Sequence, residues 1–370
     1  MPPDVMTENS IDLLSRLLFQ GYSEGFEAPA ADLQLVYADV SQLAHLSDSA
    51  LAALVEVATK HHVLIRALRV VNVAAHHLQE TRLADWSSQV LETEAKRIGH
   101  AIQALGPVCY ALESAGCHVT VIKSLDHMPD LGSDLDLYTS GDAATVVEVM
   151  RREFNSHTEQ RSWGDRLAGK WNFSVPGLPE LIEIHVRYLG QTGEHQAVAR
   201  RVLSRSVVKV LDGQAFRVPA PEERIVISTL QRMYRHFDFR LCDMADVAAL
   251  VQNHAINFVE LRKAADSGGI WPGVATFLFL VSKYVEKYGG RAPVPDSVIA
   301  SAQSSNIAVH PRGDFLRVPM GSAASLYASQ LLAAGRKFDV RALTRLPLLP
   351  PLAVSALVAY RLTGSDKGIW

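Results

Sequence analysis

The stretch VTVIKSLDHMPDLGSDLDLY, residues 119–138, decides the fold. Its first residues are mostly β-branched and apolar, which predicts a buried strand over 119–123. Near its end, Asp134 and Asp136 alternate with leucines, and residues two apart in a strand share one face of a sheet. The pattern therefore predicts a second strand over 135–139, with both carboxylates on one face and the leucines in a core.

Two carboxylates held on one strand favour a hard divalent cation such as Mg²⁺, which prefers oxygen ligands. Aspartate is disfavoured in strands, so two in alternation need a reason. Gly132 and Ser133, just before them, allow close backbone approach and offer amides and a hydroxyl beside a phosphate. The plain alternative is a solvated pair on an exposed strand face.

A second stretch, LIEIHV over 181–186, also alternates with period two. Its isoleucines face a core, whereas Glu183 and His185 face the other way. A third carboxylate on a neighbouring strand would complete a cluster for two metals, which align an attacking oxygen and a phosphate leaving group. Glu183 could otherwise be an exposed strand residue. His185 could partner the metal ligands, contact substrate or be exposed.

Basic residues offer a place for phosphate. Lys123 ends the first strand and could neutralise phosphate charge, or be a surface lysine. Ser124 could donate its hydroxyl to a phosphate, or be a turn serine. Arg232, His236 and Arg240 recur every four residues in an expected helix, so they form a basic ridge. The ridge could grip a triphosphate or an acidic acceptor; pairing with Asp243 and Asp246 between helices is slightly favoured.

Composition fits a globular protein. The chain has 370 residues, 48% hydrophobic and 20% charged, enough for two or three domains. The net charge of -3 argues against a strongly basic nucleic-acid binder. Three cysteines without metal spacing indicate reduced thiols and a cytoplasmic location. No leader peptide is evident, and prolines break the apolar tract 346–362, which predicts a packed C-terminal helix and no membrane span.

The pattern changes twice along the chain. We expect an N-terminal helical region over 1–115 that packs on the core, an α/β core over 116–219, and a C-terminal helical domain over 220–370. Expected elements include helices over 50–78 and from Ser87 or Ser88 to 115, a hairpin around Asp212-Gly213, and a helix starting at Pro221. The fold class is therefore α+β, a small mixed sheet flanked by helical regions.

At this point the residues resemble a family. Gly132-Ser133-Asp134-x-Asp136 with the later Glu183 resembles the DNA polymerase beta-like nucleotidyltransferase superfamily, and most closely its bacterial branch of uncharacterised nucleotidyltransferases. The ordered series covers about 88–251: a long helix, a strand ending in Lys123-Ser124, the two acidic strands, a hairpin and the Arg240–Asp246 segment. Ser124 stands where the family usually has glycine.

The resemblance implies transfer of a nucleoside monophosphate from an NTP, ATP being the expected donor, to an acceptor hydroxyl with release of pyrophosphate. Asp134 and Asp136 would bind both Mg²⁺ or Mn²⁺ ions, and Glu183 would complete the site and help remove the proton. Lys123, Ser124, Gly132, Ser133 and Arg240 are the expected nucleotide contacts. A small-molecule acceptor is favoured over RNA or protein. A phosphotransferase and a non-catalytic nucleotide-binding protein are the alternatives; the sequence leaves base preference and oligomeric state open.

Overall fold

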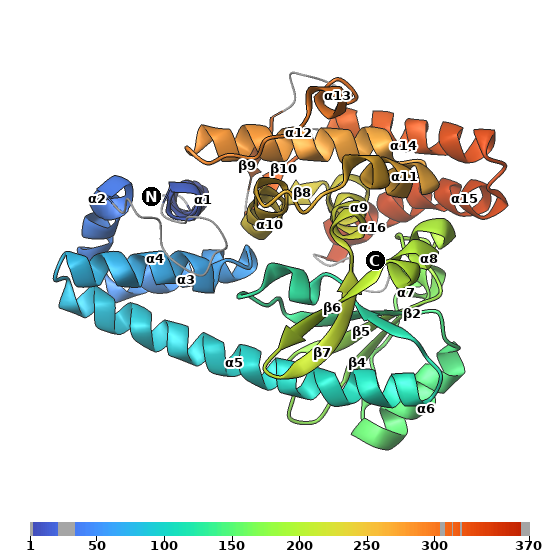
Figure 1. Ribbon diagram of the computed structural model, residues 1–370, viewed down its shortest axis with the longest axis horizontal. Coiled ribbons are helices and arrows are strands. Elements are labelled where there is room, and N and C mark those ends of the chain that lie inside the picture. Colours follow the sequence, from blue (N-terminus) through green and yellow to red (C-terminus); the bar gives the residue numbers. More distant parts are fainter. Residues whose placement is uncertain (1–2, 21–33, 304–307, 313, 319, 364–370) are drawn as a thin grey trace.

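The computed structural model describes residues 3–20, 34–303, 308–312, 314–318 and 320–363. A small sheet occupies the middle of the chain, helices precede and follow it, and the expected α+β class is confirmed (Figure 1). Residues 21–33 and 364–370, which fall in regions expected to be helical, lie outside the described residues.

The main sheet has five strands in the order β1-β2-β5-β4-β3. Strands β2 and β5 are parallel and every other neighbouring pair is antiparallel, so the sheet is mixed. Their bounds are β1 (Val119–Val121), β2 (Asp134–Thr139), β3 (His157–Thr158), β4 (Lys170–Ser174) and β5 (Leu181–Val186). The strand expected over 119–123 ends early because Lys123 has a φ of 59° and Ser124 N donates to Ile122 O, a strained γ-turn.

The helices before the sheet are α1 (Pro3–Gln20), α2 (Gln34–Ala44), α3 (Asp48–Lys60), α4 (Leu64–His77) and α5 (Thr81–Ser114). Within the α/β part lie the 3₁₀-helix η1 (Ser124–His127), α6 (Ala143–Phe154), α7 (Trp163–Ala168) and α8 (Gln196–Ser204). The hairpin of β6 (Ser206–Leu211) and β7 (Gln214–Pro219) is confirmed, and Asp212 and Gly213 both have positive φ, as its two-residue turn requires.

The C-terminal helices are α9 (Pro221–Gln231), the π-helix η2 (Arg232–His236), α10 (Leu241–Gln252), α11 (Phe258–Ser267), α12 (Trp271–Lys287), α13 (Asp296–Ile299), α14 (Met320–Arg336), α15 (Val340–Arg345), the 3₁₀-helix η3 (Leu346–Leu348) and α16 (Leu349–Thr363). A small sheet β8-β10-β9 joins β8 (Asp238–Phe239), β10 (Phe315–Arg317) and β9 (His310–Arg312). In the described part of the chain, no helix combines the length and apolarity needed to cross a bilayer. The tract 346–362 forms η3 and most of α16, where Leu346 is buried and Val354 is exposed.

Two hydrophobic clusters organise the molecule. One lies on the sheet and includes Leu135, Leu137, Ile182 and Ile184, packed against the second half of α5 and against α6. These are the strand residues expected to face a core, and their burial leaves the other face of β2 and β5 to the polar residues.

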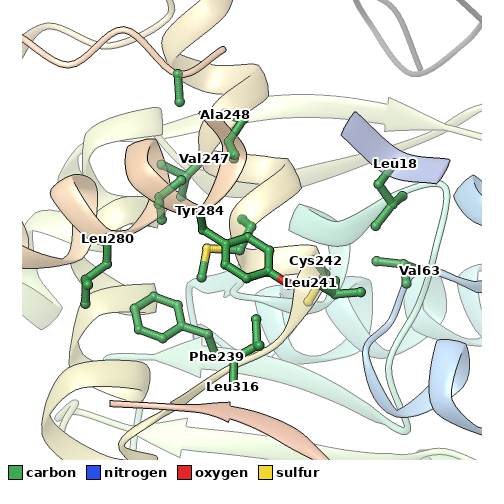
Figure 2. Close-up of a cluster of buried hydrophobic side chains, with 14 of the residues drawn as sticks. Leu18, Val63, Phe239, Leu241, Cys242, Val247, Ala248, Leu280, Tyr284 and Leu316 are labelled. Atoms are coloured by element: carbon green, nitrogen blue, oxygen red, sulfur yellow. The ribbon is translucent and has the colours of Figure 1, made fainter. Parts of the chain in front are cut away.

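The other cluster joins the N-terminal and C-terminal helices. Figure 2 shows Leu18 and Val63 close to Leu241, Cys242 and Tyr284 in this cluster. Residues 11–20 and 34–84 therefore share a core with helices after 220, while α5 continues from there onto the sheet cluster (Figure 1). The division into 1–115, 116–219 and 220–370 stays a prediction.

The continuous helix expected over 50–78 is wrong. It divides into α3 and α4, because His62 adopts a φ of 52° between them. The break directs His61 to the start of α10, where its Nδ1 accepts from Leu241 N at 3.0 Å and its carbonyl accepts from Cys242 N at 3.2 Å. First-turn amides have no partner within their own helix, so His61 satisfies two of them.

The next helix begins at Thr81, earlier than expected. Ser87 and Ser88 lie inside α5, where both hydroxyls accept from Asn72 Nδ2 of α4, at 2.9 and 2.8 Å, instead of capping a helix. Pro221 does start a helix, but α9 ends at Gln231. A serine that caps a helix and a serine that bonds a neighbouring helix look the same in sequence. This explains why the sequence indicates a cap at Ser87 or Ser88.

Candidate active site

A cavity of about 740 Å³, partly open to solvent, lies on the polar face of β2 and β5. All eight residues that the sequence predicts as catalytic, metal-binding or nucleotide-binding line it: Lys123, Ser124, Gly132, Ser133, Asp134, Asp136, Glu183 and Arg240. The other lining residues are His62, His127, Lys170, Gln231, Arg232, Arg235 and His236. Residues distant in sequence thus converge on one space.

The register of two parallel strands places the carboxylates. Asp136 lies opposite Glu183 across the β2–β5 pair, and each side chain is at most 13% exposed. One oxygen from each and one nitrogen of His185 lie within 4.8 Å of one another, close enough to bind one ion. Asp134, two residues earlier on the same face, lines the cavity but is outside this trio.

Two lysines neutralise the carboxylates. Lys123 Nζ is paired with Asp136 Oδ1 and lies 3.6 Å from Glu183 Oε1. Lys170 Nζ lies 2.7 Å from Glu183 Oε2 and 3.2 Å from Asp165 Oδ1. The sequence did not single out Lys170; its only signal is its place at the start of an expected strand.

These charges set the proton affinities. Burial would raise the pKa of Glu183, but Lys123, the hydrogen bond from His185 and the charge of Lys170 hold it well below its ordinary value. Burial raises the pKa of Asp134, and the neighbouring carboxylates raise it further. Glu183 is therefore a stable anion, whereas Asp134 gains most from an added cation.

Ser124 positions the second strand. Its Oγ accepts from Asp136 N at 2.7 Å and donates to Asp134 O at 3.1 Å. The residue is buried and its hydroxyl proton is already used, so the expected hydroxyl donation to a phosphate is not what this structure shows. The serine instead fastens the turn after β1 to the start of β2.

Gly132 is required by close packing. A Cβ at this position would lie 2.8 Å from Cε1 of His62, nearer than such contacts normally come. Ser133 beside it is exposed and lines the cavity. His62 in turn accepts from Arg240 Nη1 at its Nε2, at 2.7 Å. Gly132 thus leaves room for the ring of His62, which lies in the break between α3 and α4.

The prediction of a basic ridge along one helix is wrong, although Arg232, His236 and Arg240 all line the same cavity. After α9 the chain forms η2, turns at Phe237 with a φ of 54°, and begins α10 after Arg240. Arg232 is buried against Asp243 at 2.7 Å, as the favoured alternative expected. Asp246 instead pairs with helix α4.

Arg235, which the sequence analysis missed, has no hydrogen bond or ion pair among the described residues and lines the cavity. It follows the predicted Arg232 by three positions and lies on the same π-helix, η2. An arginine with free donors facing a cavity is suited to bind phosphate.

A buried network holds the segment between β1 and β2. Arg66 Nη2 of α4 donates to Asp246 Oδ1 at 2.6 Å, to His127 O at 2.8 Å and to Met128 O at 3.1 Å. His127 Nδ1 lies 2.5 Å from the other oxygen of Asp246, and Asp130 accepts from Ile65 N at 2.6 Å. The segment leading to Asp134 is therefore fixed to α4 and α10.

No family model and no curated protein matches the chain. Among solved structures, it is similar to an antigenic nucleotidyltransferase-like protein from Paracoccidioides brasiliensis, with 15% identity over 44% of this chain and 84% of that chain. The TM-score is 0.30, a similarity too low to add to what the strand order and the cavity show.

Proposed function

We propose that this protein is a metal-dependent nucleotidyltransferase that moves a nucleoside monophosphate from an NTP, with ATP as the expected donor, to a hydroxyl of a small molecule. The observation that carries the proposal is the register that sets Asp136 beside Glu183, with Asp134 on the same face, in one cavity with arginines. The resemblance of Gly132-Ser133-Asp134-x-Asp136 to the polymerase beta-like superfamily supports the same reading.

The donor set fits Mg²⁺ or Mn²⁺. Asp134, Asp136 and Glu183 supply oxygen ligands, and the raised pKa of Asp134 indicates a carboxylate short of positive charge. When bound, the ions would polarise the phosphate and lower the pKa of the attacking hydroxyl. Lys123, which pairs with Asp136 on the wall of the same cavity, would neutralise phosphate charge.

The other residues have separable tasks in this proposal. Arg235 and Arg240 bind phosphate oxygens from the η2 and α10 side, while Ser124 and Gly132 fix the backbone near the α-phosphate. The acceptor oxygen forms a bond to the α-phosphorus, and the bond from that phosphorus to pyrophosphate breaks. The hydroxyl proton passes to the Glu183 carboxylate and then to solvent.

The test is Mg²⁺-dependent pyrophosphate release from ATP over a panel of small-molecule alcohols. Asp134→Asn and Asp136→Asn should each lower the rate at least about 100-fold, since each removes a charge aimed at the transition state. Asp142→Asn is the control: Asp142 caps α6 outside the cavity, and asparagine caps equally well. Unchanged release in both cavity variants would contradict the proposal.

The products decide between the alternatives. Mass spectrometry of the modified acceptor separates a nucleotidyl from a phosphoryl adduct, because the two differ greatly in mass. A phosphoryl adduct would assign the same site to a phosphotransferase. Calorimetric binding of Mg·ATP without turnover across the whole panel would assign it to a nucleotide-binding protein.

A further inference from the structure

A second pocket adjoins the carboxylate cavity and shares Lys123, Gln231 and Arg235 with it. It is partly open to solvent, and Leu189, Ile227 and Leu230 give it apolar walls. Because the two spaces share these residues, a molecule in the second pocket lies beside the one in the first.

His185 links the pocket to the carboxylates. Its Nε2 lies 2.8 Å from Glu183 Oε1, and a carboxylate only accepts, so Nε2 carries the proton. Its Nδ1 is buried and has no hydrogen-bond partner among the described residues, although the ring, in a residue only 5% exposed, lines the second pocket. Buried polar atoms are normally bonded, so this nitrogen indicates a missing partner.

Glu194 is the second unusual group in this pocket. It is 4% exposed, and its Oε2 accepts from Thr192 N at 2.8 Å and from Thr192 Oγ1 at 3.0 Å. No lysine or arginine of the described residues forms an ion pair with it. The nearest candidate cation is His195, 3.6 Å away, but burial lowers the pKa of His195 and keeps it neutral.

A buried carboxylate without a cation is costly, because two neutral hydrogen bonds do not replace its hydration. The apolar walls suit an apolar body. Lys123 and Arg235 also line the pocket, but the carboxylate cavity shares both of them. Two buried groups of this pocket that the cavity does not share, Glu194 and His185, specify what else the ligand must offer. A cationic nitrogen suits Glu194, and a hydroxyl, which donates and accepts, suits the free nitrogen of His185.

We propose that the second pocket binds the acceptor, and that the acceptor is an amino alcohol with an apolar body. This inference rests on the proposed function and adds the chemical class of its substrate. The ammonium group pairs with Glu194, the body lies on Leu189 and Ile227, and the hydroxyl bonds to His185. That hydroxyl donates to the free Nδ1, so its proton passes to His185 while the Nε2 proton of His185 passes to Glu183.

The test compares two probes of the same size on the full chain without nucleotide: trans-2-aminocyclohexanol and trans-cyclohexane-1,2-diol. Dissociation constants come from saturation-transfer NMR titrations. The wild type should bind the amine at least about tenfold more tightly than the diol. Glu194→Gln should abolish the preference, since it removes the charge and keeps an oxygen for Thr192. Glu148→Gln, an exposed residue of α6, should keep it.

Equal affinity for both probes in the wild type, or an unchanged preference in Glu194→Gln, would overturn the inference. A melting temperature of Glu194→Gln within about 2 °C of the wild type shows that the variant is folded. If the variant melts at a lower temperature, the preference of the wild type for the amine over the diol is measured at increasing salt concentrations instead. A preference based on charge falls with ionic strength. Binding of Mg·ATP is measured separately by calorimetry. If the protein does not bind Mg·ATP, the proposed function is contradicted, while the preference for the amine still tests the ligand class of the second pocket.

Discussion

Replacing Arg66 with methionine should destabilise the protein far more than the same change at Arg82. Each arginine bonds an aspartate at nearly equal distance, Arg66 to Asp246 at 2.6 Å and Arg82 to Asp48 at 2.7 Å. Arg66 also lies 3.5 Å from Asp130. Both also donate to two backbone carbonyls. They differ in burial: the side chain of Arg66 is 1% exposed and that of Arg82 is 52% exposed.

The magnitude follows from what each loss leaves behind. Removing Arg66 leaves the buried carboxylates of Asp246 and Asp130 without their shared guanidinium, and breaking a buried pair costs about 3–5 kcal/mol. Removing Arg82 frees an aspartate that water already solvates, at about 0–1 kcal/mol. With an unfolding entropy of about 2.1 cal/mol/K per residue, a 370-residue chain shifts by about 1.3 °C per kcal/mol. The expected fall in melting temperature is therefore roughly 4–7 °C for Arg66→Met, against at most about 1 °C for Arg82→Met.

Scanning calorimetry of both variants measures the difference. Adding Asp246→Asn to Arg66→Met should recover part of the loss, because the second change removes a buried negative charge that has lost its guanidinium partner and keeps, among the described residues, only the ion pair with His127. Hydrogen exchange should show faster opening at 126–131, the segment that Arg66 holds. Equal shifts for the two arginine variants would refute the reasoning that burial decides the cost.

Three further outcomes are expected. Ser124→Ala should cost about 1–3 kcal/mol in urea unfolding, because Asp136 N loses its acceptor. His61, whose pKa burial lowers to about 4, stabilises the fold above pH 6.5 and less as pH falls towards 4. His61→Gln should therefore reduce the loss of unfolding free energy between pH 7.5 and 4.5 by about 2.5 kcal/mol. Lys170→Met should tighten Mn²⁺ binding, measured by electron paramagnetic resonance, at least about tenfold, since it removes a cation from Glu183; weaker binding would contradict this.

The sequence predicts the strands and the acidic residues well because both depend on local alternation. Period two places Leu135 and Leu137 in the sheet cluster, and the carboxylates must then lie on the opposite face. Each expected strand and the hairpin appear, with ends displaced by at most two residues. Asp136 and Glu183 lie side by side once their strands, β2 and β5, are neighbours in the sheet.

The failures come from single residues with conformations that tertiary contacts select. His62 and Phe237 each interrupt an otherwise helical pattern with a positive φ, and neither is glycine or asparagine. Phe237 O accepts from Val318 N, and His61 caps α10, so the partners lie about 80 and 180 positions away. No local pattern distinguishes Arg235 from other helical arginines.

Helix α5 has a mechanical consequence for how the cavity can admit a ligand. At about 1.5 Å per residue, its 34 residues span roughly 50 Å, and it is a member of both hydrophobic clusters. Its section between them, 85–97, contains neither glycine nor proline, so it offers no point at which a hinge forms cheaply. A rotation of the two hydrophobic clusters relative to each other would have to bend this section of α5. We therefore expect a ligand to enter through the part of the cavity that is open to solvent, and not through a movement of the two clusters apart.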